Sequence, residues 1–254
     1  MSQRVALIEQ EYGVTCTRIT LSNWYKQNGV AHAKPNYKLS YRYSPGEMLH
    51  FQQQFCKKLM HYWRRRAVEI VFIDECSCNA WDKPGKMWVM KDEPFHTRLA
   101  PTRGKNVQIQ GAISNRQPEF MWTDKKKNNA RSFKALLVKL TPWLKNPERT
   151  VYILDNASWH RNAGIKAYLR RKGISVMYLP SSSSVLNPIE QCWGTFKRQL
   201  ARTLATYTHE QLKALNFKRA VHEELYTFAR EQDGTRYANN GKRKVKLVLD
   251  GHVQ

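Results

Sequence analysis

The chain has 254 residues, 41% of them hydrophobic and 11% aromatic, which supports a folded core and excludes wholesale disorder. Forty-three Lys and Arg residues stand against 20 Asp and Glu residues, a formal net charge of +23 at pH 7. This excess indicates a polyanionic partner. Nucleic acid is the polyanion that best fits Lys and Arg residues spread along a chain, because binding that neutralises its phosphates releases counterions. On charge alone, a ribosomal or membrane-surface protein is the alternative.

The five cysteines are scattered and form no CxxC pair, so the sequence gives little support for a zinc site and favours reduced thiols. No apolar run reaches the length of a membrane span, and no signal peptide follows Met1. We therefore expect a protein that is not secreted and has no membrane partner. Its expected location is the nucleus in a eukaryotic source, and the cytoplasm or nucleoid otherwise.

Residues 1–40 predict two short helices joined by a turn that contains a glycine. "VALIEQEYG" is typical of a helix that ends at Gly13, and "VTCTRITLSNWYKQNGV" is typical of a second helix. This pattern fits a helix-turn-helix whose second helix offers Arg18, Asn23 and Lys26 to DNA. An ordinary helical hairpin fits the pattern equally well.

Residues 41–65 are interpreted as a polar linker and a connecting helix. The helix is expected to start at Glu47 and to run for about fifteen residues into "YWRRR". Its terminal Arg64 and Arg65 are expected to contact DNA. We place the boundary of the next domain near residue 65.

Residues 66–225 are predicted to form one α/β domain. Apolar strands are expected at "EIVFIDEC", "KNVQIQGAIS", "EFMWT", "RTVYILDNAS" and "ISVMYLP", with helices at "NARSFKALLVKLTPWL" and "AGIKAYLRRKG". Strands first, followed by alternating helices and strands, predict a mixed sheet flanked by helices. Residues 226–254, with "ANNGKRKVK", are expected to form a basic tail that packs poorly or depends on a partner.

Two apolar strands end in an aspartate, Asp74 in "IVFIDE" and Asp155 in "VYILDN". The ends of strands are where sites form in α/β sheets, although an aspartate there can also cap the next helix. In "LNPIE", Asn187 is expected to cap a helix, which would place Glu190 in a capping box.

The 34 residues between Asp155 and Glu190 hold a helix, a strand and a serine-rich loop. This crossover is long enough to return Glu190 to the strand ends beside Asp74 and Asp155. Carboxylates that converge in a basic chain predict a Mg²⁺ site, because Mg²⁺ prefers oxygen ligands and keeps substrate phosphates in its shell. Two such ions can clamp the oxygens of an in-line phosphoryl displacement.

Three motifs together resemble the catalytic signatures of one family. "FIDE", "LDNASWH" and "SVLNPIEQCWGTFK" are similar to those of mariner-like DDE transposases, in the branch that has Glu as third acid and includes bacterial insertion-sequence relatives. The resemblance covers roughly residues 66–200. It implies an RNase H-like fold, metal-dependent cleavage of DNA at transposon ends, and attack of the freed 3′-OH on target DNA.

The resemblance also implies roles for single residues. Asp74, Asp155 and Glu190 would be the catalytic ligands of two Mg²⁺ or Mn²⁺ ions. Trp193 is expected to pack its helix against the sheet. The supporting residues would be Glu75, Asn156, His160 and Asn187, with His160 either placing a ligand or phosphate or serving as a structural histidine, and Lys197 and Arg198 would reach phosphate.

The implied partner is double-stranded DNA, both the terminal repeats of a transposon and its target, bound by a homodimer on paired ends. Two alternatives stay open: a catalytically silent relic that binds DNA, and another RNase H-like nuclease that cuts without strand transfer. Such transposases usually carry two helix-turn-helix units, and residues 1–40 have room for one. A single unit would be expected if the chain is a fragment, a truncated copy, or a catalytic subunit adapted by its host.

Overall fold

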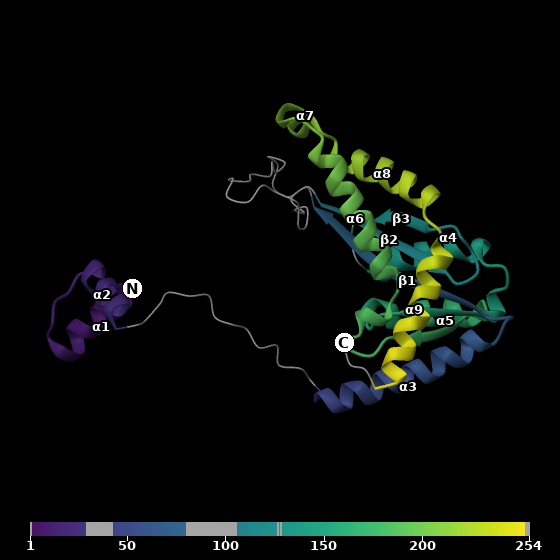
Figure 1. Cartoon of the computed structure of the whole chain (residues 1–254), viewed down its shortest axis with the longest axis horizontal. Helices are drawn as coiled ribbons and strands as arrows, with labels where there is room; N and C mark the ends of the chain where they lie inside the picture. The colour runs from purple at the N-terminus through teal and green to yellow at the C-terminus, as the bar shows by residue number, and fades with distance from the viewer. Residues whose placement is uncertain (1, 29–42, 80–105, 126, 128, 252–254) are drawn as a thin grey trace. The chain divides into compact units, whose positions relative to one another are not determined.

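The computed structural model describes residues 2–28, 43–79, 106–125, 127 and 129–251. The chain divides into two compact units, Met1–Arg42 and Tyr43–Gln254, which are described separately (Figure 1). Within the described residues, no helix is both long enough and apolar enough to cross a bilayer.

The first unit holds the two predicted helices, α1 (Ser2–Tyr12) and α2 (Arg18–Gln27). Gly13 follows α1 with φ +63°, the left-handed conformation that glycine adopts easily after a helix. The side chain of Thr17 caps α2 by accepting a hydrogen bond of 3.1 Å from the amide of Thr20. On α2, Leu21 is buried, whereas Trp24 is 54% exposed.

The second unit is built on a five-stranded sheet with the order β3-β2-β1-β4-β5. β1, β2 and β3 pair antiparallel, while β1, β4 and β5 pair parallel, so the sheet is mixed as predicted. The carboxyl ends of β4 and β5 therefore open at the same edge. The strands are β1 (Glu69–Asn79), β2 (Asn106–Ser114), β3 (Met121–Lys125), β4 (Thr150–Leu154) and β5 (Ser175–Tyr178).

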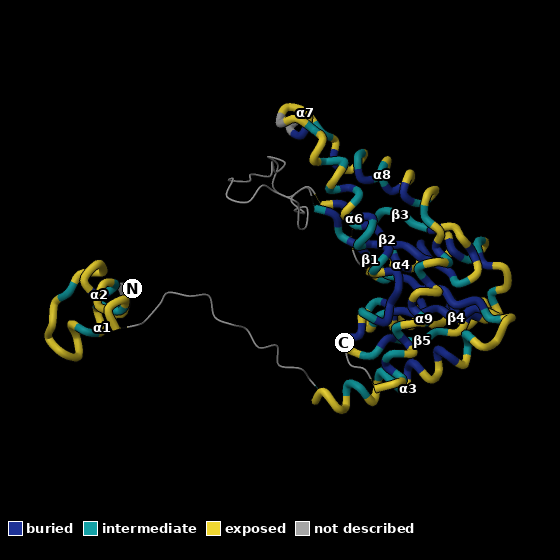
Figure 2. The backbone as a smooth tube through the Cα atoms, viewed as in Figure 1, coloured by how far each residue is buried: buried dark blue, intermediate teal, exposed yellow. Residues whose placement is uncertain are grey.

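Helices cover both faces of this sheet, and Figure 2 shows their buried inner sides and exposed outer sides. One face packs against α3 (Pro45–Arg64), α6 (Ile189–Ala205), α8 (Phe217–Glu231) and α9 (Gly234–Leu249). The other face packs against α4 (Ala130–Leu140) and α5 (Ala163–Arg171). The remaining elements are α7 (His209–Ala214) and the short 3₁₀ helices η1 (Thr141–Trp143), η2 (Pro147–Arg149), η3 (Ser158–Arg161) and η4 (Ser184–Leu186).

Successive residues of β1 alternate between the two cores. Phe72 packs into the core under α6, and Ile73 packs into the core under α4. The same alternation directs Asp74 toward α6 and Glu75 toward α4. The strand therefore sends two adjacent carboxylates to different layers of the protein.

The structure corrects the expected basic tail. Residues 226–251 continue α8 and form α9, and Ala238, Val245 and Val248 are buried in the core. Small or apolar residues recur every three or four positions along α9, which gives it a packing face that its high Lys and Asn content conceals. The prediction of a poorly packed tail was wrong.

The connecting helix also differs from its prediction. α3 begins at Pro45 and carries a capping box formed by Ser44 and Glu47. Its residues Phe55 and Leu59 lie in the same core as the sheet, so the helix belongs to the second unit. The division between units falls after Arg42 rather than near residue 65, and residues 41–42, at the start of the expected linker, lie outside the described residues.

Candidate active site

A cavity of about 380 Å³ opens at the carboxyl ends of the parallel strands, beside the loop that leads into α6. Asp74 reaches it from β1, Asp155 from the end of β4, and Glu190 from the first turn of α6. The crossover therefore returns Glu190 to the strand ends, as its length predicted. The rest of the wall includes Asn156, Ala157, Leu179, Pro180, Ser181, Ser182, Ser183, Ser184 and Asn187.

Asp74 is the carboxylate whose ionisation this cavity opposes most strongly. Burial, followed by repulsion from Glu190, raises the pKa of Asp74 to about 8, and Glu75 and Asp155 add to the repulsion. The amide of Glu75 donates a hydrogen bond of 2.8 Å to Asp74 Oδ1, which opposes the rise but does not cancel it. A cation beside Asp74 would relieve this repulsion.

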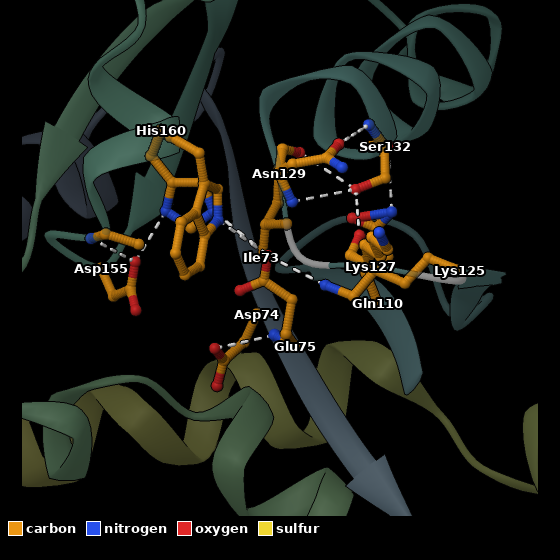
Figure 3. A network of polar contacts seen from close by, with 12 residues as sticks. Ile73, Asp74, Glu75, Gln110, Lys125, Lys127, Asn129, Ser132, Asp155 and His160 are labelled. Atoms are coloured by element: carbon orange, nitrogen blue, oxygen red, sulfur yellow. Dashed lines mark hydrogen bonds and ion pairs between the residues drawn. The ribbon is translucent and has the colours of Figure 1, made fainter. Parts of the chain in front are cut away.

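Glu75 lies in a different environment, on the side of the sheet that faces α4. Its Oε1 atom lies 3.1 Å from the ammonium of Lys125 and 3.4 Å from Nε2 of His160 (Figure 3). The indole of Trp159 donates a hydrogen bond of 3.3 Å to the same oxygen. Burial would raise the pKa of Glu75, but His160 and Lys125 outweigh burial and lower it.

His160 links Glu75 to the end of β4. It lies in η3, is 1% exposed, and its Nδ1 atom lies 2.6 Å from Asp155 Oδ1. Burial would lower the pKa of His160, but the contacts with Asp155 and Glu75 raise it to about 9. His160 therefore bridges the two carboxylates, and Phe133 packs against its ring at a centroid distance of 4.1 Å.

Asp155 is half-exposed and accepts a hydrogen bond of 2.9 Å from the amide of Ala157. Burial would raise the pKa of Asp155, but His160 and this amide lower it. Asn156 donates a hydrogen bond to the carbonyl of Leu179, which ties the end of β4 to the end of β5. The strand ends are thus fixed on both sides of the cavity.

The start of α6 corrects one prediction about the helix cap. The helix begins at Ile189, and no side chain caps it. Asn187 instead donates a 3.5 Å hydrogen bond to the carbonyl of Ile73, because its buried side chain points toward β1 rather than toward the helix amides. Burial raises the pKa of Glu190, and attraction to Lys197 and Lys244 opposes the rise.

Trp193 packs α6 against the sheet, as predicted. It is 3% exposed, and its ring meets the ring of Phe120 edge-on at a centroid distance of 5.1 Å.

The oxygen donors fit a divalent cation. Among the described residues, one ligand atom from each of Asp74, Glu75 and Asp155 lies within 4.8 Å of the others. Carboxylate oxygens are the hard ligands that Mg²⁺ or Mn²⁺ prefers, and a cation beside them would offset the repulsion that raises the pKa of Asp74. Glu190 lines the same cavity but stands outside this tight group, whereas Glu75, which the sequence placed in a supporting role, stands within it.

Within the second unit, none of the residues predicted to contact DNA lines the cavity. Arg18, Asn23 and Lys26 are exposed on α2, in the first unit. Arg64 and Arg65 are exposed at the end of α3, near the amino ends of the parallel strands and so at the edge of the sheet opposite the cavity. Lys197 and Arg198 continue α6 beyond Glu190, with Lys197 half-buried and Arg198 exposed.

Sequence reasoning missed two groups at the site. Lys125 opens the run "KKK", which is typical of a solvated surface, yet its side chain is only 2% exposed and pairs with Glu75. Lys244 of α9 donates a 3.4 Å hydrogen bond to the carbonyl of Val185, beside the cavity. The alternation of β3 could have indicated that Lys125 faces inward, but no local pattern indicates that α9 returns to the site.

The sequence model of the DDE superfamily endonuclease family matches residues 69–213, which include Asp74, Asp155 and Glu190. The chain belongs to the DDE superfamily endonucleases. It is 22% identical over 175 residues to the Tcb2 transposase of Caenorhabditis briggsae, covering 61% of this chain and 60% of that protein. It is 27% identical over 145 residues to the Tc3 transposase of Caenorhabditis elegans, covering 55% of this chain and 44% of that protein. The chain thus spans less than two thirds of these curated relatives.

Solved structures of Mos1 transposase share the fold of this DDE endonuclease. A Mos1 paired-end complex with the left transposon end has a TM-score of 0.63 at 15% identity, covering 99% of this chain and 78% of that chain. The catalytic domain of Mos1 mariner transposase has a TM-score of 0.58 at 14% identity, covering 85% of this chain and 98% of that chain. The predicted RNase H-like fold is confirmed.

Proposed function

We propose that this chain is a DNA transposase that cuts DNA at transposon ends in a metal-dependent reaction and joins the freed 3′-OH to target DNA. The observation that carries the proposal is the convergence of Asp74, Asp155 and Glu190 on one cavity in a DDE superfamily endonuclease. The curated relatives are named as transposases of transposable elements, and the Mos1 structures include a strand transfer complex.

We propose that Asp74, Asp155 and Glu190 hold two Mg²⁺ or Mn²⁺ ions, with Glu75 close enough to adjust the position of Asp74. The Mos1 paired-end complexes were solved with Mn and with Mg, which supports this choice. Bound ions would activate the attacking oxygen and offset the charge that develops on the leaving oxygen.

The chain's own residues fix the geometry of this reaction. His160 holds Asp155 and Glu75 from behind the sheet, so these carboxylates keep their positions before DNA arrives. Asn187 and Trp193 hold the start of α6 against β1 and β2, which sets the place of Glu190. Rotamers that are locked in this way reduce the entropy lost in reaching the reactive geometry.

The proposed partner is double-stranded DNA, in keeping with the net charge of +23. α2 would contact DNA through its exposed Arg18, Asn23 and Lys26, and α6 through Lys197 and Arg198. Arg64 and Arg65 would contact phosphates away from the cavity. We propose that the protein acts as a homodimer on paired ends, in the nucleus of a eukaryotic source or the nucleoid of a bacterial one.

The test is nicking of a supercoiled plasmid with Mg²⁺ or Mn²⁺ by the wild type, by Glu190→Gln and by the control Glu231→Gln. Glu231 is an exposed acid at the end of α8, so its substitution removes the same charge away from the cavity. We expect metal-dependent nicking by the wild type and the control, and none by Glu190→Gln. Equal nicking by all three proteins would remove Glu190 from the site.

The two alternatives give different results in the same assay. Salt-sensitive DNA binding without nicking by any protein, on plasmids that carry candidate transposon ends, would select the silent relic. Nicking without joining of a labelled 3′-OH strand to a target plasmid would select another RNase H-like nuclease. Nicking with joining supports the transposase.

A further inference from the structure

The outer face of α9 carries positive charge that the described part of the protein leaves unpaired. We call Asn239, Asn240, Lys242, Arg243 and Lys246 the basic face of α9. Four of these residues are exposed and Lys242 is half-buried. Their spacing of three to four residues places them on one side of the helix, opposite the buried Ala238, Gly241, Val245 and Val248.

The buried side of α9 holds the helix against the residues that lead into α6. A β-carbon on Gly241 would lie 3.0 Å from Cγ of Pro188, so the helix touches the residue that precedes α6. Lys244 donates to the carbonyl of Val185 in the loop beside the cavity. Figure 1 shows α9 beside α6, and the two helices pack together. α9 is therefore held beside the first turn of α6, which carries Glu190, with its basic face turned outward from this contact.

The neighbouring helix α8 shows that this charge is not a general property of the surface. α8 balances its Lys and Arg with acids of its own, and Arg219 pairs with Glu223 at 2.7 Å. From Gly234 to Leu249, α9 contains no acid at all. No ion pair joins its basic face to any acid that the structure describes. Unpaired cations on a rigid helix suit a partner that brings its own negative charge.

We infer that the basic face of α9 binds the phosphate backbone of the DNA that enters the catalytic cavity. The inference rests on the proposed function and adds a contact surface outside the family-matched residues 69–213. From Asn239 to Lys246 the helix rises about 10 Å, the length of roughly three base-pair steps. Lys and Arg would neutralise phosphates, and the two Asn side chains would donate hydrogen bonds to phosphate oxygens.

The experiment measures binding of the full chain to a generic double-stranded DNA, without metal, over a range of salt concentrations. The test variant is Lys242→Gln with Arg243→Gln and Lys246→Gln. The matched control is Lys134→Gln with Lys166→Gln and Arg170→Gln, which removes the same charges from exposed positions of α4 and α5 on the other face of the sheet. Glutamine is a good helix former, and thermal melting checks that both proteins fold.

We expect the α9 variant to bind about tenfold or more weakly and its log–log salt slope to fall by about two to three, one for each lost phosphate contact. The control should keep the wild-type slope to within about one. A second variant, Lys242→Arg with Arg243→Lys and Lys246→Arg, keeps the charges and should keep the wild-type slope.

Equal losses in the α9 variant and the control would overturn the inference, because charge alone would then explain binding. Wild-type affinity in the α9 variant would overturn it too. Both results leave the proposed function intact, since the wild type still binds DNA. A wild type that shows no salt-dependent DNA binding would overturn the inference and the proposed DNA partner together.

Discussion

Trp193 packs against Gly111 so closely that a β-carbon at Gly111 would lie 2.8 Å from Cη2 of the indole. Gly111 is the cross-strand partner of Asp74 in the pairing of β1 with β2. Trp193 follows Glu190 by less than one helical turn. The contact between Gly111 and Trp193 therefore sets how closely α6 brings Glu190 to Asp74.

Gly111→Ala should push α6 away from the sheet. The new methyl would also meet Cζ of Phe120 at 2.9 Å and the backbone carbonyl of Met121 at 3.0 Å, so no single rotation relieves the overlap. We expect a loss of about 1–3 kcal/mol in the free energy of unfolding, measured by urea denaturation, and slower metal-dependent nicking.

The control for Gly111→Ala is Gly194→Ala on α6, where an added β-carbon would have no neighbour closer than Arg198 Nη1, at 3.8 Å, apart from the adjoining helix backbone. This substitution should leave stability unchanged or raise it by up to about 1 kcal/mol, because alanine favours a helix interior. A Gly111→Ala protein as stable as the wild type would show that α6 does not depend on this contact.

Asp155→Asn should abolish metal-dependent cleavage, since a neutral amide is a poor ligand for a hard divalent ion. DNA affinity measured in EDTA should stay nearly unchanged, because a carboxylate does not itself bind phosphate. Asp124→Asn is the control: Asp124 pairs with Lys218 at 2.6 Å on β3, and its loss should leave cleavage intact. Wild-type cleavage by Asp155→Asn would contradict the metal assignment.

Lys125→Met should destabilise the metal-free protein strongly. It leaves Glu75, whose side chain is 12% exposed, without the ammonium that lies 3.1 Å away. Removing one partner of a buried pair costs about 3–5 kcal/mol when the other charge is left alone, and the contact that Glu75 keeps with His160 should bring the loss to the lower end of this range. Chemical denaturation in EDTA measures this loss, and the double variant Lys125→Met with Glu75→Gln should recover part of it.

Lys127→Met is the matched control, because Lys127 is exposed two residues further along the chain. It should change the free energy of unfolding by less than about 0.5 kcal/mol. If Lys125→Met and Lys127→Met behave alike, the pair with Glu75 contributes nothing to the fold.

Asp233→Ala tests the start of α9. Asp233 Oδ1 accepts hydrogen bonds from the hydroxyl of Thr235 at 2.6 Å and from its amide at 2.9 Å. Both hydrogen bonds lower the pKa of Asp233, and the bond from the hydroxyl contributes most. A helix cap of this kind contributes about 1 kcal/mol at pH 7, so Asp233→Ala should lower the free energy of unfolding by that amount.

The sign of the pH dependence follows from the lowered pKa of Asp233. The stabilising carboxylate is fully charged above the pKa of the unfolded chain, near 4, and its contribution is lost as pH falls through the lower folded value. The difference between the wild type and Asp233→Ala should therefore shrink below about pH 4. Asp250→Ala, at the other end of α9, should show no such loss, because an acid there opposes the helix dipole.

Much of the fold could be predicted because local chemistry decides it. The apolar runs of β1 and β4, the glycine after α1 and the 3.6-residue spacing of α4 all act within a few residues. The three acids of the site could be predicted from their motifs, since Asp74, Asp155 and Glu190 do line one cavity. α9 was misjudged because a face of Gly, Ala and Val packs well only against a neighbour that already has the complementary shape.

Asn187 shows the same limit at the level of one side chain. Its position before a helix favours a cap, yet the side chain turns to the carbonyl of Ile73, 114 residues away in sequence. A local pattern cannot weigh a hydrogen bond to a partner that only folding brings near.

The sequence by itself determined the strands of the sheet, the helices up to α6, the acids Asp74 and Asp155 that follow the apolar runs of β1 and β4, and the length of chain that returns Glu190 to them. Only the tertiary structure decided that Asp74 faces α6 while Glu75 faces α4. It also decided that Lys125 contacts Glu75, that His160 contacts Glu75 and Asp155, and that α9 packs beside the start of α6. The physical reason is range: propensity and periodicity act between near neighbours, whereas burial and charge pairing depend on which distant segments share the same low-dielectric space.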